Sequence, residues 1–203
     1  MKQASDTKQK LLDAANELIW TSNYGSVSVD DICAKADVNK GSFYHFFESK
    51  ADLAVEAIED YWQKNRGKLD SIFSTQTSPL DRIAAFCDLV YESQKEKMGK
   101  TGKVCGCPYG SIASEQSTLE ETIRQKSTEM FGRVMKYLEA TLRDAVREEL
   151  VAPGDAGVLA GDVHALIEGV LLQAKVQNNL EVVRQLKPAI FRLLGAKSPV
   201  AVG

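Results

Sequence analysis

Apolar residues recur along most of this chain at the three- and four-residue spacing that places them on one face of a helix. The first such stripe consists of Leu11, Ala15, Leu18 and Ile19. The later stripes consist of Ile83, Phe86, Cys87, Val90 and Tyr91, then Leu119, Ile123, Met130, Val134, Leu138 and Leu142, and then Leu159, Val163, Leu166, Ile167, Val170 and Leu171. Alternation between apolar and polar positions, the pattern of a half-buried strand, occurs only in short runs such as residues 26–30 and 138–143. The pattern therefore predicts an all-α protein.

Helix boundaries are marked by capping residues and by helix breakers. Ser78 provides a capping hydroxyl before Pro79 at the first helical position, which predicts a helix start. Ser117, with Glu120 three residues later, has the spacing of a capping box and predicts another start. Mixed charges and two glycines favour a solvated loop over residues 95–103. Breaks between helices are expected at residues 99–102, 151–154 and 178–179.

Three helix starts fall close together within residues 27–53. They are marked by Ser28 with Asp31 three residues on, by Asn39, and by Ser49. The linker between the first two of these helices, residues 36–38, is so short that it leaves room only for a tight corner. This spacing predicts a helix-turn-helix.

The middle helix of this segment, residues 40–47, sorts its side chains by face. Three phenylalanines at i, i+3 and i+4 are expected to point inward, namely Phe43, Phe46 and Phe47. The outer face is left with Lys40, Gly41, Tyr44 and His45. A short helix held across a tight turn has the dimensions to enter the major groove of DNA, with its N-terminal half against the base edges. Ser28 and Lys50, at the starts of the flanking helices, are then expected to meet phosphates.

The same segment resembles the DNA-binding region of the TetR (tetracycline-repressor-like) family. The resemblance rests on Asp30-Asp31-Ile32, on Asn39-Lys40-Gly41-Ser42-Phe43-Tyr44-His45-Phe46-Phe47, and on Ser49-Lys50. It covers about residues 8–55. In the rest of the chain, the segment Gly106-Cys107-Pro108-Tyr109-Gly110 is similar to a stretch in some members.

The resemblance implies a homodimeric, all-α repressor made of two domains. Residues 1–50 would form a three-helix, helix-turn-helix domain that binds operator DNA. Residues 51–203 would form a bundle of about six helices that dimerises and holds a small-molecule effector. The DNA-binding residues that the resemblance implies are Ser28, Lys40, Gly41, Ser42, Tyr44, His45 and Lys50.

Two features of the N-terminal segment bear on this interpretation. The turn position that is often glycine in such proteins is Asp37 here, and Asp is one of the residues that tolerate a left-handed conformation best, so the turn should survive. Residues 1–50 contain six lysines, no arginine and seven acidic residues, which gives a net charge of −1. Sequence-independent affinity for DNA is therefore expected to be weak.

Several residues of the later helices are candidates for an effector pocket. By default each packs in the core of the bundle, but the resemblance implies that some of them line a cavity. The candidates are Trp62, Phe86, Tyr91, Cys107, Tyr109, Phe131 and His164. Apolar and aromatic walls with a few polar points suit a small, mostly apolar or aromatic compound.

The last two long helices are predicted at about residues 155–177 and 180–194, and each carries a wide apolar stripe. The stripe of the second helix consists of Leu180, Val183, Leu186, Ile190 and Leu194. Two such helices from each subunit would form a four-helix interface around a two-fold axis, which predicts a homodimer. Pro188 has no backbone N–H, so it is expected to kink or divide the second helix.

The four cysteines are of two kinds. Cys33 and Cys87 occupy helix positions and are expected to be small buried hydrophobic residues. Cys105 and Cys107 precede Pro108 and a predicted helix start, where the helix dipole lowers the pKa of a thiol. A reactive thiol and simple packing near the pocket both remain open for this pair. A metal site is disfavoured, because two sulfurs are too few ligands and no histidine lies nearby in sequence.

Composition indicates a globular protein and excludes several classes. Of the 203 residues, 44% are hydrophobic and 26% are charged, and the net charge of −3 excludes a globally basic protein that coats nucleic acid. No run approaches the roughly 20 consecutive apolar residues of a membrane span. The first twenty residues include Asp6, Asp13 and Glu17, unlike a signal peptide. We expect reduced thiols, a cytoplasmic location and no membrane partner.

Two other functional classes compete with a ligand-responsive repressor. A helical thiol oxidoreductase or detoxifying enzyme would use Cys105 and Cys107, but no base, glycine-rich phosphate loop or carboxylate pair accompanies them at a recognisable spacing. A helical adaptor that binds protein through the Tyr44 face would not require Ser28 and Lys50 at their helix starts. The repressor is preferred, without enzymatic activity, cofactor or metal ion.

Overall fold

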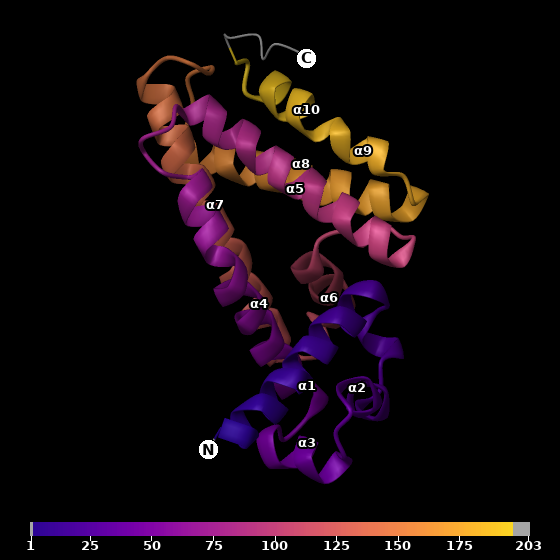
Figure 1. Ribbon diagram of the computed structural model, residues 1–203. Helices are drawn as coiled ribbons and strands as arrows, with labels where there is room; N and C mark the ends of the chain where they lie inside the picture. Colours follow the sequence, from indigo (N-terminus) through magenta and orange to yellow (C-terminus); the bar gives the residue numbers. More distant parts are fainter. Residues whose placement is uncertain (1, 197–203) are drawn as a thin grey trace. The chain divides into compact units, whose positions relative to one another are not determined.

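All regular structure in the described part of the chain is helical, which confirms the predicted fold class (Figure 1). The computed structural model describes residues 2–196, with side chains from residue 6 onward. In chain order the elements are α1 (Lys2–Thr21), the short 3-10 helix η1 (Tyr24–Ser26), α2 (Val29–Ala36), α3 (Lys40–Phe46), α4 (Lys50–Ile72), α5 (Pro79–Thr101), α6 (Pro108–Gln116), α7 (Glu121–Arg147), α8 (Ala156–Gln177), α9 (Leu180–Arg184) and α10 (Leu186–Leu193).

The described residues form two compact units, each made from two stretches of sequence. The N-terminal unit comprises residues 2–66 and 108–131, and the C-terminal unit comprises residues 67–107 and 132–196. Helices α4 and α7 therefore contribute to both units, whereas α6 belongs to the N-terminal unit, where it contacts α1 and η1. This unit is larger than the stretch of residues 1–50 expected to bind DNA.

The helix-turn-helix forms from the predicted caps and turn. The Ser28 hydroxyl accepts a hydrogen bond from the backbone N–H of Asp31 at 3.1 Å, and the Asp31 carboxylate accepts one from the backbone N–H of Ser28 at 2.8 Å. The Asn39 side chain caps α3 by accepting a hydrogen bond from the backbone N–H of Ser42 at 2.8 Å. Asp37 ends α2 with φ of 54° and ψ of 50°, so aspartate supports the left-handed turn as expected.

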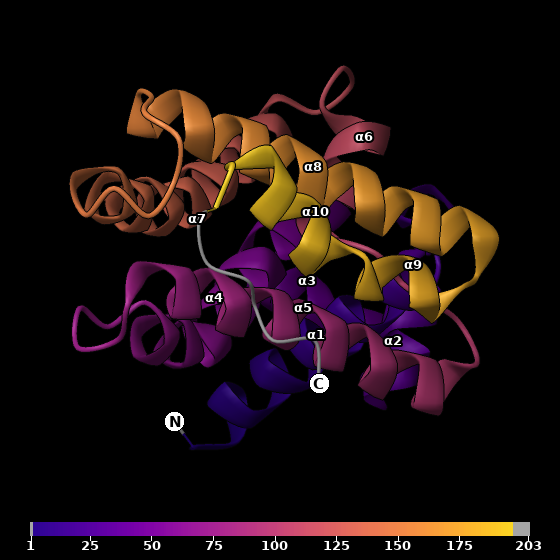
Figure 2. The same ribbon diagram turned by 90° about the horizontal axis from the view of Figure 1, so that it is seen from above.

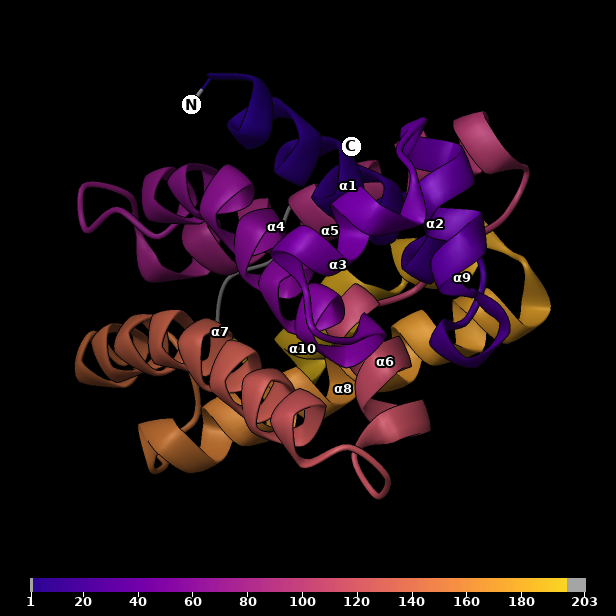
Figure 3. The same ribbon diagram turned by 90° about the horizontal axis from the view of Figure 1, so that it is seen from below.

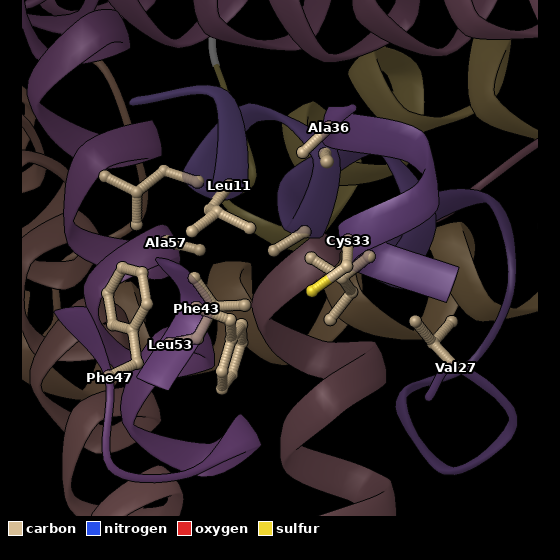
Figure 4. Packing of buried hydrophobic residues seen from close by; sticks show 12 residues of the cluster. Leu11, Val27, Cys33, Ala36, Phe43, Phe47, Leu53 and Ala57 are labelled. Carbon is tan, nitrogen blue, oxygen red and sulfur yellow. The ribbon is translucent and has the colours of Figure 1, made fainter. Parts of the chain in front are cut away.

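Helices α1 to α4 carry this motif (Figure 3), and their buried residues form the core under it (Figure 4). Phe43 and Phe47 are buried among Leu11, Leu53 and other members of the cluster, whereas Phe46 packs against the same cluster but is only partly buried. The reason is that α3 ends at Phe46. Phe47 follows in an extended conformation, with φ of −135°, so the helical spacing that would bring both side chains inward does not continue.

The C-terminal unit is built on α5, α8, α9 and α10. Helices α9 and α10 lie along α8, and both also contact α5 (Figure 2). Its core is formed by apolar residues at helical spacing, including Ile83 and Phe86 of α5, Val163, Ile167 and Leu171 of α8, and Val183, Leu186 and Ile190 of the last two helices. The chain divides at Gln185, three residues before Pro188, so the predicted interruption of the last helix is confirmed.

Helix α8 has a second apolar face besides the one in this core. By length and composition alone, α8 could cross a membrane. Its exposed positions include Val158, Leu172 and Val176, at exposed fractions of 63%, 62% and 78%. Ala165 and Gly169 are also exposed. Positions 158, 165, 169, 172 and 176 follow one another at helical spacing, so these five residues form a second face of the helix.

Two predicted boundaries are wrong. Residues 95–101 are not a loop but the last turns of α5, where Lys100 pairs with Glu96 one turn earlier at 2.6 Å and Gly102, at φ of 71°, ends the helix. Helix α7 begins at Glu121, and Ser117 does not cap it. The Ser117 hydroxyl instead donates a hydrogen bond back to the carbonyl oxygen of Ala113 at the end of α6.

Candidate nucleic-acid interface and effector site

The outer face of α3 presents the residues that the sequence assigns to DNA. Lys40, Gly41, Tyr44 and His45 are exposed, and the Tyr44 side chain is 58% exposed although it is aromatic. The Tyr44 ring meets Phe43 edge-on, with 5.1 Å between the ring centroids, so the core phenylalanine supports it from below. Ser42 is half-buried and Ser28 is exposed at the start of α2. The outer face of α3 thus presents the Lys40 ammonium, the rings of Tyr44 and His45, and the exposed Gly41 to a ligand.

Lys40 is held by an acidic residue of α2. Its Nζ atom lies 2.8 Å from one carboxylate oxygen of Asp30 and 2.9 Å from the other. The hydrogen bond to Asp30 raises the pKa of Lys40, so this lysine is charged at neutral pH. This pair could not be predicted from the sequence, because nothing in the spacing of Asp30 and Lys40 indicates a contact across the turn.

The Lys50 side chain is held against the loop that precedes Ser28 and does not extend over an open surface. Its Nζ atom donates hydrogen bonds to the carbonyl oxygens of Tyr24 and Val27, each at 2.9 Å, and sits 4.0 Å from the centroid of the Tyr24 ring. Desolvation by burial lowers the pKa of Lys50. These contacts support a positioning role for Lys50, which fixes the loop that leads to Ser28. Direct contact of Lys50 with phosphate stays a prediction.

The predicted effector residues are divided between the two units. Trp62, Tyr109 and Phe131 belong to the N-terminal unit, and Phe86, Tyr91, Cys107 and His164 belong to the C-terminal unit. Tyr109, with Trp20 and Tyr61, lines a cavity of about 20 Å³ between α1, α4 and α6. This volume holds about one water molecule and is far below that of a drug-sized ligand.

Within the C-terminal unit, two of the predicted residues have structural partners of their own. Phe86 is buried and packs on Phe73, with 5.3 Å between the ring centroids. The hydroxyl of Tyr91 accepts a hydrogen bond from Arg184 of α9 at 2.6 Å, and the Arg184 guanidinium stacks 5.1 Å from the ring centroid. Phe86 therefore has the contacts of a core residue, whereas Tyr91 joins α5 to α9 at the surface.

Cys107 and His164 are brought together by Glu168. The Cys107 thiol donates a hydrogen bond to the Glu168 carboxylate, and His164 Nε2 lies 4.0 Å from the same carboxylate. Burial raises the pKa of Glu168 and lowers the pKa of His164, so the imidazole is neutral at pH 7. His164 and Glu168 are one helical turn apart on α8. Glu168 could not be predicted from the sequence, because a single glutamate in an apolar stripe gives no signal that it meets a thiol.

The loop that carries Cys107 is held at several points. The buried Gln94 amide accepts a hydrogen bond from the Gly106 N–H at 2.9 Å and donates one to the Gly106 carbonyl at 3.1 Å. The Asn178 side chain accepts a hydrogen bond from the backbone N–H of Val104 at 2.9 Å. Gly106 has φ of 75°, and a Cβ atom there would lie 3.2 Å from the Lys175 side chain. The position therefore requires glycine for its backbone conformation.

The remaining cysteines are buried in the structure. Burial raises the pKa of Cys33 and raises that of Cys87 to about 12, which agrees with their prediction as small hydrophobic residues. Cys105 is also buried, and its Sγ atom lies 3.7 Å from the Lys103 carbonyl oxygen rather than facing Glu168. Among the described residues, no three histidine, cysteine, aspartate or glutamate side chains are grouped to hold a metal ion.

Two family models match the chain. Residues 11–57 match the model described as bacterial regulatory proteins, tetR family. Residues 79–188 match the C-terminal domain model described as transcriptional regulator LmrA/YxaF-like. Together they take in the helix-turn-helix and most of the later helices.

Relatives and solved structures agree with these models. An uncharacterized HTH-type transcriptional regulator in the lacX 3' region of Lactococcus lactis is 31% identical over 95% of this chain and 96% of its own. Transcriptional regulator AcuR of Cereibacter sphaeroides is 32% identical over 86% of this chain and 78% of its own. The regulatory protein TetR of Rhodobacter sphaeroides superposes with a TM-score of 0.81 at 28% identity, over 91% and 96% of the two chains. The reduced form of Escherichia coli NemR shares the fold, with a TM-score of 0.80 at 24% identity over 97% and 100%.

Proposed function

The chain belongs to the tetR family of bacterial regulatory proteins, and we propose that it is a repressor that binds a palindromic operator as a homodimer and is released by a small effector. The observation that carries the proposal is the outer face of α3, where Lys40, Tyr44 and His45 are exposed on a helix that Phe43 anchors in the core. The relatives are transcriptional regulators, including the repressor NemR, so the alternative of a thiol oxidoreductase has no support. The cytoplasm is the expected location.

The roles of the proposed DNA-binding residues follow from where they lie. Tyr44 and His45 would contact base edges in the major groove, and Lys40 would meet a phosphate at its rim. Ser28, at the N-terminus of α2, would meet a phosphate through its hydroxyl and the free backbone N–H groups of the first turn. Gly41 has no side chain, so it leaves room for the DNA backbone to approach. Ser42, next to Gly41 on α3, is half-buried.

The stripe of α8 that was expected to form the dimer interface is buried within one subunit, as Val163, Ile167 and Leu171 show, so the proposed dimer rests instead on the second apolar face of α8. Its exposed stripe, Val158, Ala165, Gly169, Leu172 and Val176, combines small and branched residues, which allow helices to pack closely. Leu193 of α10, 45% exposed, extends the same kind of surface on the last helix. A copy of α8 and α10 from a second subunit would cover these residues and form the four-helix interface.

The proposed effector is small and mostly apolar or aromatic, and the cluster at Cys107 favours compounds that react with a thiol. Cys107 is half-buried on a loop that Gln94 fixes, and its side chain is hydrogen-bonded to the Glu168 carboxylate. In a conjugate addition to an unsaturated carbonyl compound, the Cys107 sulfur would bond to the electrophilic carbon as the carbon–carbon π bond opens, and the thiol proton would end on the adjacent carbon. Cys105, as a second thiol two residues away, faces other partners.

A gel-shift assay tests the proposed function. A labelled DNA fragment that flanks the gene for this protein is titrated with the purified chain, beside a fragment of equal length and unrelated sequence. The proposal predicts that the flanking fragment shifts at a protein concentration at least about 1,000-fold lower than the unrelated one. Equal shifts for the two fragments, or none, would contradict a sequence-specific repressor.

A further inference from the structure

The lysines of the N-terminal unit are occupied by partners from the protein itself. Five of those with described side chains in residues 6–66 pair with a carboxylate, and Lys50 binds two carbonyl oxygens. The carboxylate pairs are Lys8 with Glu56 at 2.6 Å, Lys10 with Asp6 at 3.5 Å, Lys35 with Glu17 at 2.6 Å, Lys40 with Asp30 at 2.8 Å, and Lys64 with Asp13 at 2.5 Å and Asp60 at 2.7 Å. A phosphate that approaches this unit therefore competes with a group already in place.

Lys40 differs from the other paired lysines in its position. It opens α3, on the same outer face as Tyr44, and its side chain is 54% exposed. Asp30 lies in the first turn of α2, where the positive end of the helix dipole stabilises a carboxylate. Asp31, beside it, is consumed by the capping box with Ser28, so Asp30 is the first-turn carboxylate that meets the lysine.

Two electrostatic effects oppose DNA binding at this point. The Lys40 ammonium must exchange the Asp30 carboxylate for a phosphate, so part of the gain from the new contact is lost. Asp30, itself exposed, then remains near the phosphate as a like charge. Both effects act on the backbone of any DNA sequence, because every phosphate carries the same charge.

We propose that Asp30 acts as an electrostatic brake on DNA binding, holding Lys40 and thereby lowering the affinity of the protein for DNA irrespective of sequence. This inference rests on the proposed DNA-binding face of α3. Its consequence is that binding depends on the contacts that Tyr44 and His45 make with bases. A repressor built in this way is retained less by the large excess of nonspecific DNA in a chromosome.

The test compares the parent with Asp30→Asn and with a matched control, Glu17→Gln. Both variants remove one negative charge from a lysine pair, but the control frees Lys35, which is not on α3. Binding to a random-sequence duplex of about 30 base pairs is measured by fluorescence anisotropy at several salt concentrations between roughly 50 and 200 mM. Thermal melts of all variants check that the fold is intact.

The brake predicts that Asp30→Asn binds the random duplex about three- to tenfold more tightly than the parent at the lowest salt, with a steeper salt dependence. Glu17→Gln should stay within about twofold of the parent, since exposed charges at a distance are screened. In a Lys40→Ala background, Asp30→Asn should lose most of its effect.

Three results would overturn the brake while the parent still binds DNA. Asp30→Asn could match the parent, Glu17→Gln could give the same gain, or the gain could persist undiminished in the Lys40→Ala background. Failure of the proposed function is a separate outcome, because the parent itself would then show no preference for its own flanking DNA.

Discussion

Glu115 of α6 accepts a hydrogen bond from the backbone N–H of Gly25, 3.1 Å away, although the two residues are ninety positions apart in the chain. Gly25 belongs to η1, in the loop whose carbonyl oxygens Lys50 holds and which leads to Ser28. Glu115 and Lys50 therefore both hold this loop through hydrogen bonds to its backbone. Helix α6, which carries Glu115, begins at Pro108.

Replacing Glu115 tests whether this contact prepares the helix-turn-helix for DNA. Glu115→Ala removes the acceptor and should weaken operator binding by about 1 kcal/mol, the usual net worth of a hydrogen bond of this kind. Glu115→Gln keeps an oxygen acceptor and should bind nearly as the parent does. The measurement is a gel-shift titration of all three proteins on one operator fragment. If Glu115→Ala and the parent bound equally well, the contact would have no part in DNA binding.

The buried Arg82 predicts a pH-dependent contribution to stability. Arg82 pairs with Asp144 at 2.8 Å, and this hydrogen bond lowers the pKa of Asp144 below its ordinary value of 3.8. A carboxyl whose pKa is lower in the folded state stabilises the fold above its unfolded pKa and ceases to do so as the pH falls through its folded pKa.

Asp144→Asn should therefore reduce the free energy of unfolding by about 1–3 kcal/mol at pH 7, because a buried guanidinium loses its counter-charge. The loss should persist down to about pH 4 and shrink at lower pH. Urea unfolding at pH 7 and at acidic pH measures both values. The exposed Lys100–Glu96 pair on α5 provides the control, since Glu96→Gln should leave the free energy of unfolding nearly unchanged. A pH-independent effect of Asp144→Asn would exclude the electrostatic explanation.

Leu172→Glu tests the dimer interface on α8. Leu172 is 62% exposed in the single chain, so a glutamate there leaves the fold of one subunit intact but would bury a charge between two. We expect sedimentation to show monomers and operator affinity to fall sharply, because one recognition helix reads only a half-site. Glu181→Gln, on the neighbouring α9, is a control that should stay dimeric. An intact dimer for Leu172→Glu would place the interface on another surface.

Glu168 should control how readily Cys107 reacts. A negative carboxylate beside the thiol disfavours a second negative charge on sulfur, and the thiolate is the form that reacts. The rate at which iodoacetamide alkylates Cys107 should therefore reach half of its maximum at a lower pH in Glu168→Gln than in the parent. Mass spectrometry identifies the modified cysteine, and Cys107→Ser is the control. An unchanged pH profile would mean that Glu168 does not act on the thiol. Equal release of DNA from the parent and from Cys107→Ser after alkylation would remove Cys107 from effector sensing.

The parts of the fold that were predicted correctly depend on residues near one another in sequence. The cap at Ser28, the left-handed turn at Asp37 and the break before Pro188 are each set by local backbone chemistry, which the sequence displays directly. The degree of burial of Phe46 could not be predicted from local sequence in this way. Its burial depends on where α3 ends, and a difference of one residue at a helix end redirects a side chain.

The contacts that shape the candidate sites were not predictable, because they join distant elements. Asp30 with Lys40, Glu115 with Gly25 and Glu168 with Cys107 connect residues whose spacing carries no periodic signal. Lys50 is predicted to contact phosphate because it lies at a helix start, and its hydrogen bonds to the loop carbonyl oxygens could not be predicted from that position. Tertiary packing, not local propensity, decides these cases.

A footprint of the parent and of Tyr44→Ala on the DNA that flanks the gene for this protein tests the central claim most directly. We predict that the parent protects two related half-sites about 10 base pairs, or a multiple of this, apart. Tyr44→Ala should lose roughly 1–3 kcal/mol of binding free energy, about 10- to 100-fold in affinity, while remaining folded and dimeric. Protection without a repeated half-site, or equal affinity for the two proteins, would contradict a dimeric repressor that reads its operator through α3.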